Sequence, residues 1–152
     1  MDKALEIKAA LQILKPRHKV FEAIADPAKM SNYFISKSSG RMEEGTTLMW
    51  SFPEFEGEFP VRVGIVRPGE YLSFTWDGED GTALLVEVTL STYGNDHTVV
   101  TVTEKGMPNN EAGLAWLKGN TEGWANFLAC LKAYVEYGIN LRKGAFDFRF
   151  VK

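Results

Sequence analysis

The stretch GNTEGWANFLACLKAYVEYG, residues Gly119–Gly138, decides the fold. Apolar residues recur here every three or four positions, which is typical of a helix with one wide buried side. We expect this helix to span roughly 109–141. Gly119 and Gly123 lie within it beside large aromatic residues, although a glycine inside a helix costs about 1 kcal/mol relative to alanine. The two glycines either admit a closely packed neighbour or leave a hollow.

The residues that precede this helix follow a different period. Apolar and polar residues alternate from Leu5 to Ile13 and again in five or six later segments, which is the pattern of strands with one buried face. In one segment Phe59, Val61, Val63 and Ile65 share the expected inward phase. Two short helices are expected after the first strand, one opened by Pro16 and one by Asp26-Pro27. A run of strands followed by a terminal helix predicts an α+β fold with a curved antiparallel sheet wrapped around the helix.

Length and composition restrict the function classes. A chain of 152 residues is expected to form one domain, residues 1–152. The formal net charge of −3 argues against a nucleic-acid binder, which usually carries a basic patch. No apolar run approaches the roughly 18 residues of a membrane span, and the first residues do not resemble a secretory signal. The expected location is therefore the cytoplasm.

The sequence offers little support for catalysis or for a metal. His18 and His97 are the only histidines, and neither has a second histidine or a cysteine near it in sequence. The pattern predicts no metal site, no cofactor and two solvated histidines. Cys130 falls within the helical apolar pattern and is interpreted as a buried residue. Phosphate-binding loops and nucleophile motifs are absent from the sequence, so we expect no catalytic residue, and enzymatic activity is left open as the less favoured reading.

The aromatic residues suggest a binding site. Those on the inward phases of neighbouring strands face those on the long helix, and the bare glycine backbone lies between them. One interpretation is that these aromatic residues form an ordinary hydrophobic core. The functional interpretation is a cavity with mostly apolar walls, as ligand sites usually have. The predicted ligand-binding residues are Trp50, Phe52, Val63, Phe74, Trp76, Val86, Trp116, Gly123, Trp124 and Phe127.

Five segments in order resemble one known family. They are KVFEAIADPAKMSNYF (Lys19–Phe34), EEGTTLMWSF (Glu43–Phe52), GEYLSFTWDG (Gly69–Gly78), HTVVTVTEKGMP (His97–Pro108) and EGWANFLACLKAYVEYG (Glu122–Gly138). The family is that of the activators of heat-shock-protein-90 ATPase, C-terminal-domain type, within the START-like (SRPBCC) superfamily. Tyr33-Phe34 stands where the family often has Trp-Phe. The resemblance implies the birch-pollen-allergen fold, with a sheet that grips the long C-terminal helix and a cavity that in the superfamily takes lipids, sterols or polyketides.

Two functions follow as hypotheses. The first is non-catalytic binding of a small apolar or amphipathic molecule in the cavity between the sheet and the C-terminal helix. The alternative is an interaction module without a physiological small ligand, which acts by homodimerisation or by docking on a chaperone-type partner. A co-purified small molecule would favour the first hypothesis, whereas a filled core would favour the second.

Overall fold

A computed structural model describes residues 4–149 of the chain. Seven strands form one antiparallel sheet in the order β1-β7-β6-β5-β4-β3-β2. Their bounds are Glu6–Ile13 (β1), Lys37–Ser38 (β2), Thr47–Ser51 (β3), Phe59–Arg67 (β4), Tyr71–Asp77 (β5), Ala83–Tyr93 (β6) and His97–Lys105 (β7). Strands β2 to β7 are neighbours in chain order and form a meander. The first strand, β1, pairs with the last strand, β7.

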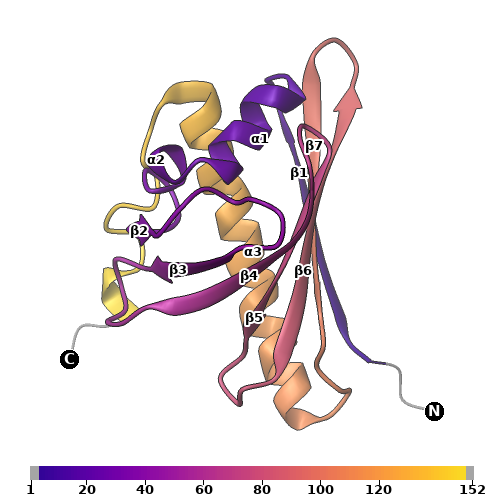
Figure 1. Cartoon of the computed structure of the whole chain (residues 1–152), viewed down its shortest axis with the longest axis vertical. Helices are drawn as coiled ribbons and strands as arrows, with labels where there is room; N and C mark the ends of the chain where they lie inside the picture. Colours follow the sequence, from indigo (N-terminus) through magenta and orange to yellow (C-terminus); the bar gives the residue numbers. More distant parts are fainter. Residues whose placement is uncertain (1–3, 150–152) are drawn as a thin grey trace.

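The helices lie mainly on one side of this sheet. Two short helices, α1 (Arg17–Ala25) and α2 (Pro27–Met30), follow β1, and the long helix α3 spans Glu111–Tyr137. Figure 1 shows the sheet curving around α3, with α1 and α2 near its C-terminal end. After α3 the chain passes α2 and β2, and its described part ends with a short 3-10 helix, η1 (Asp147–Arg149). The predicted α+β fold, with a curved antiparallel sheet around a long C-terminal helix, is confirmed.

Local signals explain where the helices begin and end. The side chain of Asp26 accepts a hydrogen bond from the backbone N–H of Ala28 at 2.9 Å, which caps α2. Asn110 caps α3 in the same way through the N–H of Gly113 at 2.8 Å. Helix α3 ends at Gly138, which adopts the left-handed conformation at φ 68° that favours glycine. The helix is continuous between these two caps.

The core fills the space between the sheet and α3. Alternate residues of the strands point inward, so Trp50, Leu72 and Val102 are almost wholly buried. They belong to one core cluster with Leu128 and Leu131 of α3. An aromatic series runs through this core and includes Tyr33, Phe34, Trp50, Phe74 and Phe127. This packing fixes α3 against the concave side of the sheet.

The expected inward phase of Ile65 is wrong. The pairing of β4 with β5 shifts between Val63 and Val66, so an irregularity reverses the alternation after Val63. Ile65 is therefore 48% exposed. The shift lies at Gly64, where an added Cβ would come within 2.6 Å of the Oγ of Ser73. That hydroxyl accepts the N–H of Ile65 at 3.0 Å, which leaves no room for a side chain at position 64.

Within residues 4–149, no helix combines the length and the apolar character that a membrane crossing requires.

Candidate functional site

An aromatic cavity of about 160 Å³ opens between the sheet and α3. Strand β5 and the loop after β3 supply one wall, α3 supplies the second, and the C-terminal segment, which we define as residues 139–149, covers the third. The cavity is open to solvent at one side. The residues that line it are Phe34, Phe52, Phe55, Trp76, Asn120, Gly123, Trp124, Asn126, Arg142, Phe146 and Arg149.

The glycines of α3 face open space. A Cβ added at Gly123 or Gly119 would meet no atom within 4 Å outside its immediate surroundings. Gly123 lines the cavity and Gly119 does not. The N-terminal Gly113 is different, because a Cβ there would lie 1.9 Å from the carbonyl oxygen of Pro108. The sequence left close packing or open space as explanations for Gly119 and Gly123, and open space applies to both. Close packing is found instead at Gly113.

A buried carboxylate lies directly behind the cavity wall. Glu104, near the end of β7, is 0% exposed. Trp76 Nε1 donates to its Oε2 at 2.7 Å, and Trp124 Nε1 donates to its Oε1 at 2.8 Å. The amide Nδ2 of Asn120 donates to Oε1 at 3.0 Å. All three partners are donors, which suits an ionised carboxylate because that group only accepts hydrogen bonds.

This network fixes the orientation of three cavity residues. Trp76, Asn120 and Trp124 all line the cavity, and each directs its donor towards Glu104 and not towards the opening. The two indole rings lie with their centroids 5.7 Å apart and their planes inclined at 32°. Both rings are thus held in place. Trp124 is only 4% exposed, so the partly buried ring of Trp76 supplies most of the indole surface that faces the cavity.

The C-terminal segment is fastened over the cavity by a largely buried ion pair. The guanidinium of Arg142 contacts the carboxylate of Glu54 at 2.7 Å, and the two side chains are only 14% and 7% exposed. The same guanidinium lies over the rings of Phe34, Phe52 and Phe146, at 5.5, 6.0 and 4.8 Å from their centroids. These distances fall in the range of cation–π attraction. The segment is therefore attached to both the core and the loop after β3.

Burial also affects the cysteine beneath this segment. Cys130 is 4% exposed, and burial raises the pKa of its thiol, while the nearby Arg142 lowers that pKa by a smaller amount. A thiol in this setting has little thiolate at neutral pH, so it is unsuited to act as a nucleophile.

The ten predicted ligand-binding residues divide into three groups. Four of them line the cavity: Phe52, Trp76, Gly123 and Trp124. Five others are buried in the core behind it: Trp50, Val63, Phe74, Val86 and Phe127. The remaining residue, Trp116, packs against the edge of the core, and its buried indole N–H has no hydrogen-bond partner among the described residues.

Several cavity residues were not identified from the sequence. Glu104 shares the inward phase of Val100 and Val102, so the strand pattern itself placed a carboxylate inside the fold. Asn120 belongs to the inner stripe of α3 but is not aromatic. Arg142 and Phe146 follow the end of α3, where no period indicates the path of the chain.

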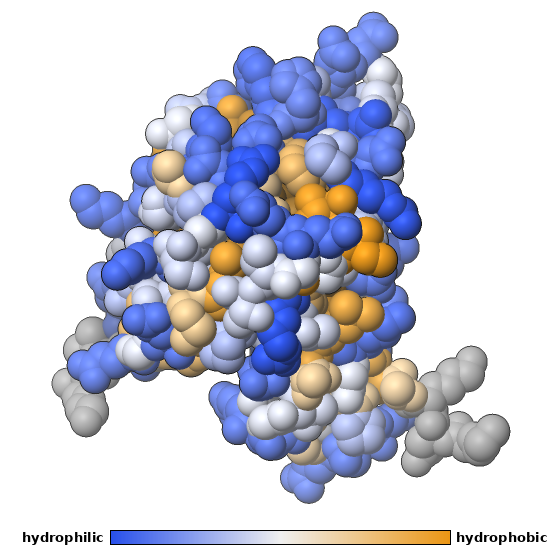
Figure 2. All heavy atoms as spheres, viewed as in Figure 1, coloured by the Kyte–Doolittle hydropathy of each residue, from blue (hydrophilic) through white to orange (hydrophobic). Residues whose placement is uncertain are grey.

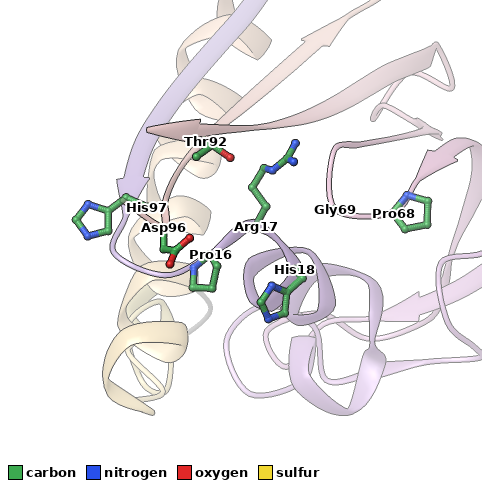
Figure 3. A pocket seen from close by; sticks show the side chains of 8 residues that line it. All are labelled: Pro16, Arg17, His18, Pro68, Gly69, Thr92, Asp96 and His97. Carbon is green, nitrogen blue, oxygen red and sulfur yellow. The ribbon is translucent and has the colours of Figure 1, made fainter. Parts of the chain in front are cut away.

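A second hollow of about 370 Å³ lies at the opposite end of the sheet. Its lining comes from the start of α1 and from the β4–β5 and β6–β7 turns, and it brings His18 and His97 to one cleft. Figure 3 shows the two imidazoles at different sides of this cleft, not facing each other. Within residues 4–149, no group of three His, Cys, Asp or Glu side chains is arranged to hold a metal ion.

Comparisons with known proteins agree with this architecture. The model of the family described as activator of Hsp90 ATPase homolog 1-like protein matches residues 15–136. A crystal structure from Staphylococcus saprophyticus is 32% identical, covers 91% of this chain and 96% of its own, and has a TM-score of 0.79. No protein among those with curated descriptions matches the chain.

Two further solved structures share the fold. A protein of the dynemicin biosynthetic locus is 26% identical with a TM-score of 0.77, over 88% of this chain and 48% of its own. The Aha1 dimer from Colwellia psychrerythraea is 21% identical with a TM-score of 0.73, over 88% of this chain and 98% of its own. The family match covers most of the chain and the Staphylococcus saprophyticus structure covers nearly all of it, and the fold around α3 is of the START-like (SRPBCC) type. The chain therefore belongs to the family of activator of Hsp90 ATPase homolog 1-like proteins.

Proposed function

We propose that the cavity binds one small apolar or amphipathic molecule without changing it chemically. The family and the fold support a ligand-binding or interaction module in general. The observation that favours binding is the aromatic cavity with the bare backbone of Gly123 in its wall. Apolar walls with a few polar groups are characteristic of small-molecule sites.

The size of the cavity limits the ligand. Its volume of about 160 Å³ is close to that of an apolar cavity of ~150 Å³ that accommodates benzene. We therefore expect a ligand that inserts a single ring or a short branched chain. A longer molecule would extend through the open side, past Phe55 and Arg149. Asn126, on α3, is available at this side to orient a polar end.

Calorimetric titration with toluene tests this proposal. The wild-type protein should bind toluene at one site. Gly123→Leu should fold and lose most of this binding, because its side chain would occupy the cavity. Gly119→Leu is the matched control, since Gly119 also faces open space on α3 but does not line the cavity. The titration is run at two temperatures, because burial of apolar surface at about 25 °C can release almost no heat. Absence of toluene binding by the wild type at both temperatures, or equal binding by both variants, would refute the proposal.

Association through the surface is a second candidate. The related Colwellia psychrerythraea protein was solved as a dimer. In this chain Ile65 is 48% exposed on β4. Figure 2 shows several apolar patches among hydrophilic side chains on the face that it displays. A homodimer that covers Ile65 should dissociate in Ile65→Lys, as measured by light scattering after size-exclusion chromatography. A monomeric wild type would exclude this candidate. Docking on a chaperone-type partner and a cytoplasmic location stay predictions.

A further inference from the structure

The charges around the aromatic cavity are not balanced. Two cations border it, and each is paired: Arg142 with Glu54 at 2.7 Å and Arg149 with Glu122 at 3.1 Å. Glu104 adds a third carboxylate behind the wall and forms no ion pair with any described residue. Two positive and three negative groups leave a net charge of −1. Because Glu104 is wholly buried, water screens this charge only weakly.

We propose that the ligand of this cavity carries a substituted ammonium group, which lies against the ring of Trp76 at the point where Trp124 borders it. The inference rests on the proposed function and names its ligand class. Indole faces attract cations more strongly than those of other aromatic side chains. Both indole N–H groups donate to Glu104, and donation to an anion increases the electron density of the ring. A cation over these rings would therefore interact both with their faces and with the carboxylate behind them.

The neighbouring rings already hold cations from the chain itself. Arg142 lies over Phe34, Phe52 and Phe146, and Arg149 lies 4.6 Å from the centroid of Phe146. Among the described residues, no arginine or lysine lies over Trp76 or Trp124. The indole ring of Trp76, which is only partly buried, is thus not occupied by a cation of the described chain.

The two arginines give an anionic ligand little advantage. Their guanidinium groups are engaged by carboxylates, so an anionic ligand would have to displace Glu54 or Glu122 to gain a full ion pair. An ammonium with alkyl substituents requires no such displacement. A substituted ammonium group also suits the apolar walls. Its methyl or methylene groups surround the charge, so the group is weakly hydrated and loses little hydration when it enters the cavity.

Three probes of one shape test the charge preference. Choline is the cation, 3,3-dimethylbutan-1-ol is its neutral isostere, and 3,3-dimethylbutanoate carries the same branched end on an anion. We expect choline to bind the wild-type protein at least about tenfold more tightly than the alcohol, with the anion the weakest of the three. Equal or tighter binding of the alcohol would overturn the inference. Tightest binding of the anion would instead assign the cavity to carboxylates at Arg142 and Arg149.

Variants assign the preference to the indole faces. Trp76→Leu should reduce the preference for choline over the alcohol to within about twofold. Tyr71→Leu is the control, because it removes a ring of the same strand, β5, that lies outside the cavity. It should keep the full preference. If circular dichroism shows that Trp76→Leu is folded and the variant still prefers choline over the alcohol to the same extent, the assignment is contradicted. Should Trp76→Leu fail to fold, Trp76→Phe, which keeps a ring but not the donor, should reduce the preference in part.

The outcomes separate this inference from the proposed function. If toluene binds but choline has no advantage over its isostere, the cavity binds apolar molecules and the ammonium assignment is wrong. If neither toluene nor any of the three probes binds, both proposals are wrong.

Discussion

The three glycines of α3 differ only in what surrounds them, so the same substitution should have opposite effects. Gly119→Ala and Gly123→Ala should each raise the free energy of unfolding by about 1 kcal/mol, because alanine is the better helix former and both positions face open space. Gly113→Ala should lower it by about 1–3 kcal/mol, since its methyl group would overlap the Pro108 carbonyl oxygen. Urea denaturation measures all three. Destabilisation by Gly123→Ala would show that the cavity wall is already packed.

Glu104 is expected to be the most sensitive polar residue of the fold. Glu104→Leu keeps the volume but leaves three donors, on Trp76, Asn120 and Trp124, without an acceptor. The donor of Trp124 is buried, and those of Trp76 and Asn120 are partly buried. An orphaned buried donor costs about 1–3 kcal/mol, so the free energy of unfolding should fall by at least about that amount. Glu104→Gln retains one acceptor oxygen and should cost less. Equal stabilities of the wild type and Glu104→Leu would mean that the network contributes nothing.

Tyr33 should make the protein sensitive to alkaline pH. Its hydroxyl donates to the carbonyl oxygen of Ala23 at 2.8 Å, and burial raises its pKa well above the ordinary value. The folded state therefore keeps a proton that the unfolded chain releases above about pH 10. Stability from this group is complete below that pH and is lost as the pH rises above it.

Tyr33→Phe isolates this contribution. At pH 8 the variant should be less stable by about 1 kcal/mol, because it lacks the hydrogen bond to Ala23. Between pH 8 and pH 11 the wild type should lose about 1.4 kcal/mol more than the variant. Chemical denaturation at the two pH values gives this difference. Parallel losses in both proteins would show that Tyr33 ionises normally in the folded state.

Among the elements, the C-terminal segment depends on one ion pair. Arg142→Met should lower the free energy of unfolding by about 3–5 kcal/mol, since it leaves the buried Glu54 carboxylate unpaired. Replacing both residues with Met should restore much of this loss. Arg149→Met is the control, because its pair with Glu122 is 41% and 64% exposed and should contribute less than about 1 kcal/mol. Additive single losses in the double variant would show that Arg142 and Glu54 act independently.

The elements were predictable where a period was long and regular. Helix α3 and strand β1 follow their hydrophobic patterns, so Glu111–Tyr137 and Glu6–Ile13 agree with the expected 109–141 and Leu5–Ile13 to within a few residues. The shift in β4 was not predictable in its position, because it depends on the contact between Gly64 and Ser73 across two strands. The path of residues 139–149 could not be predicted from the sequence either. It is set by contacts between Arg142 and distant residues, and the family match ends before it, at residue 136.

For the whole molecule, the sequence predicted the fold more fully than the site. The aromatic residues were identified, but their division between core and cavity depends on how the sheet curves around α3. Trp50 and Phe74 fill the core, whereas Trp76, two positions further along β5, reaches the cavity. Glu104 was overlooked because a carboxylate on an inward phase acquires meaning only when its donors, from β5 and α3, are in place. That the full chain forms one domain stays a prediction.

The most direct test of the central claim is the indole region of the ¹H–¹⁵N NMR spectrum during titration with toluene. The chain has four tryptophans, and therefore four indole N–H signals. The signals of Trp76 and Trp124, which line the cavity, should shift and saturate together with one dissociation constant. The signal of Trp116, which does not line it, should stay in place. Four unchanged signals at the solubility limit of toluene, or a shift confined to Trp116, would contradict binding between the sheet and α3.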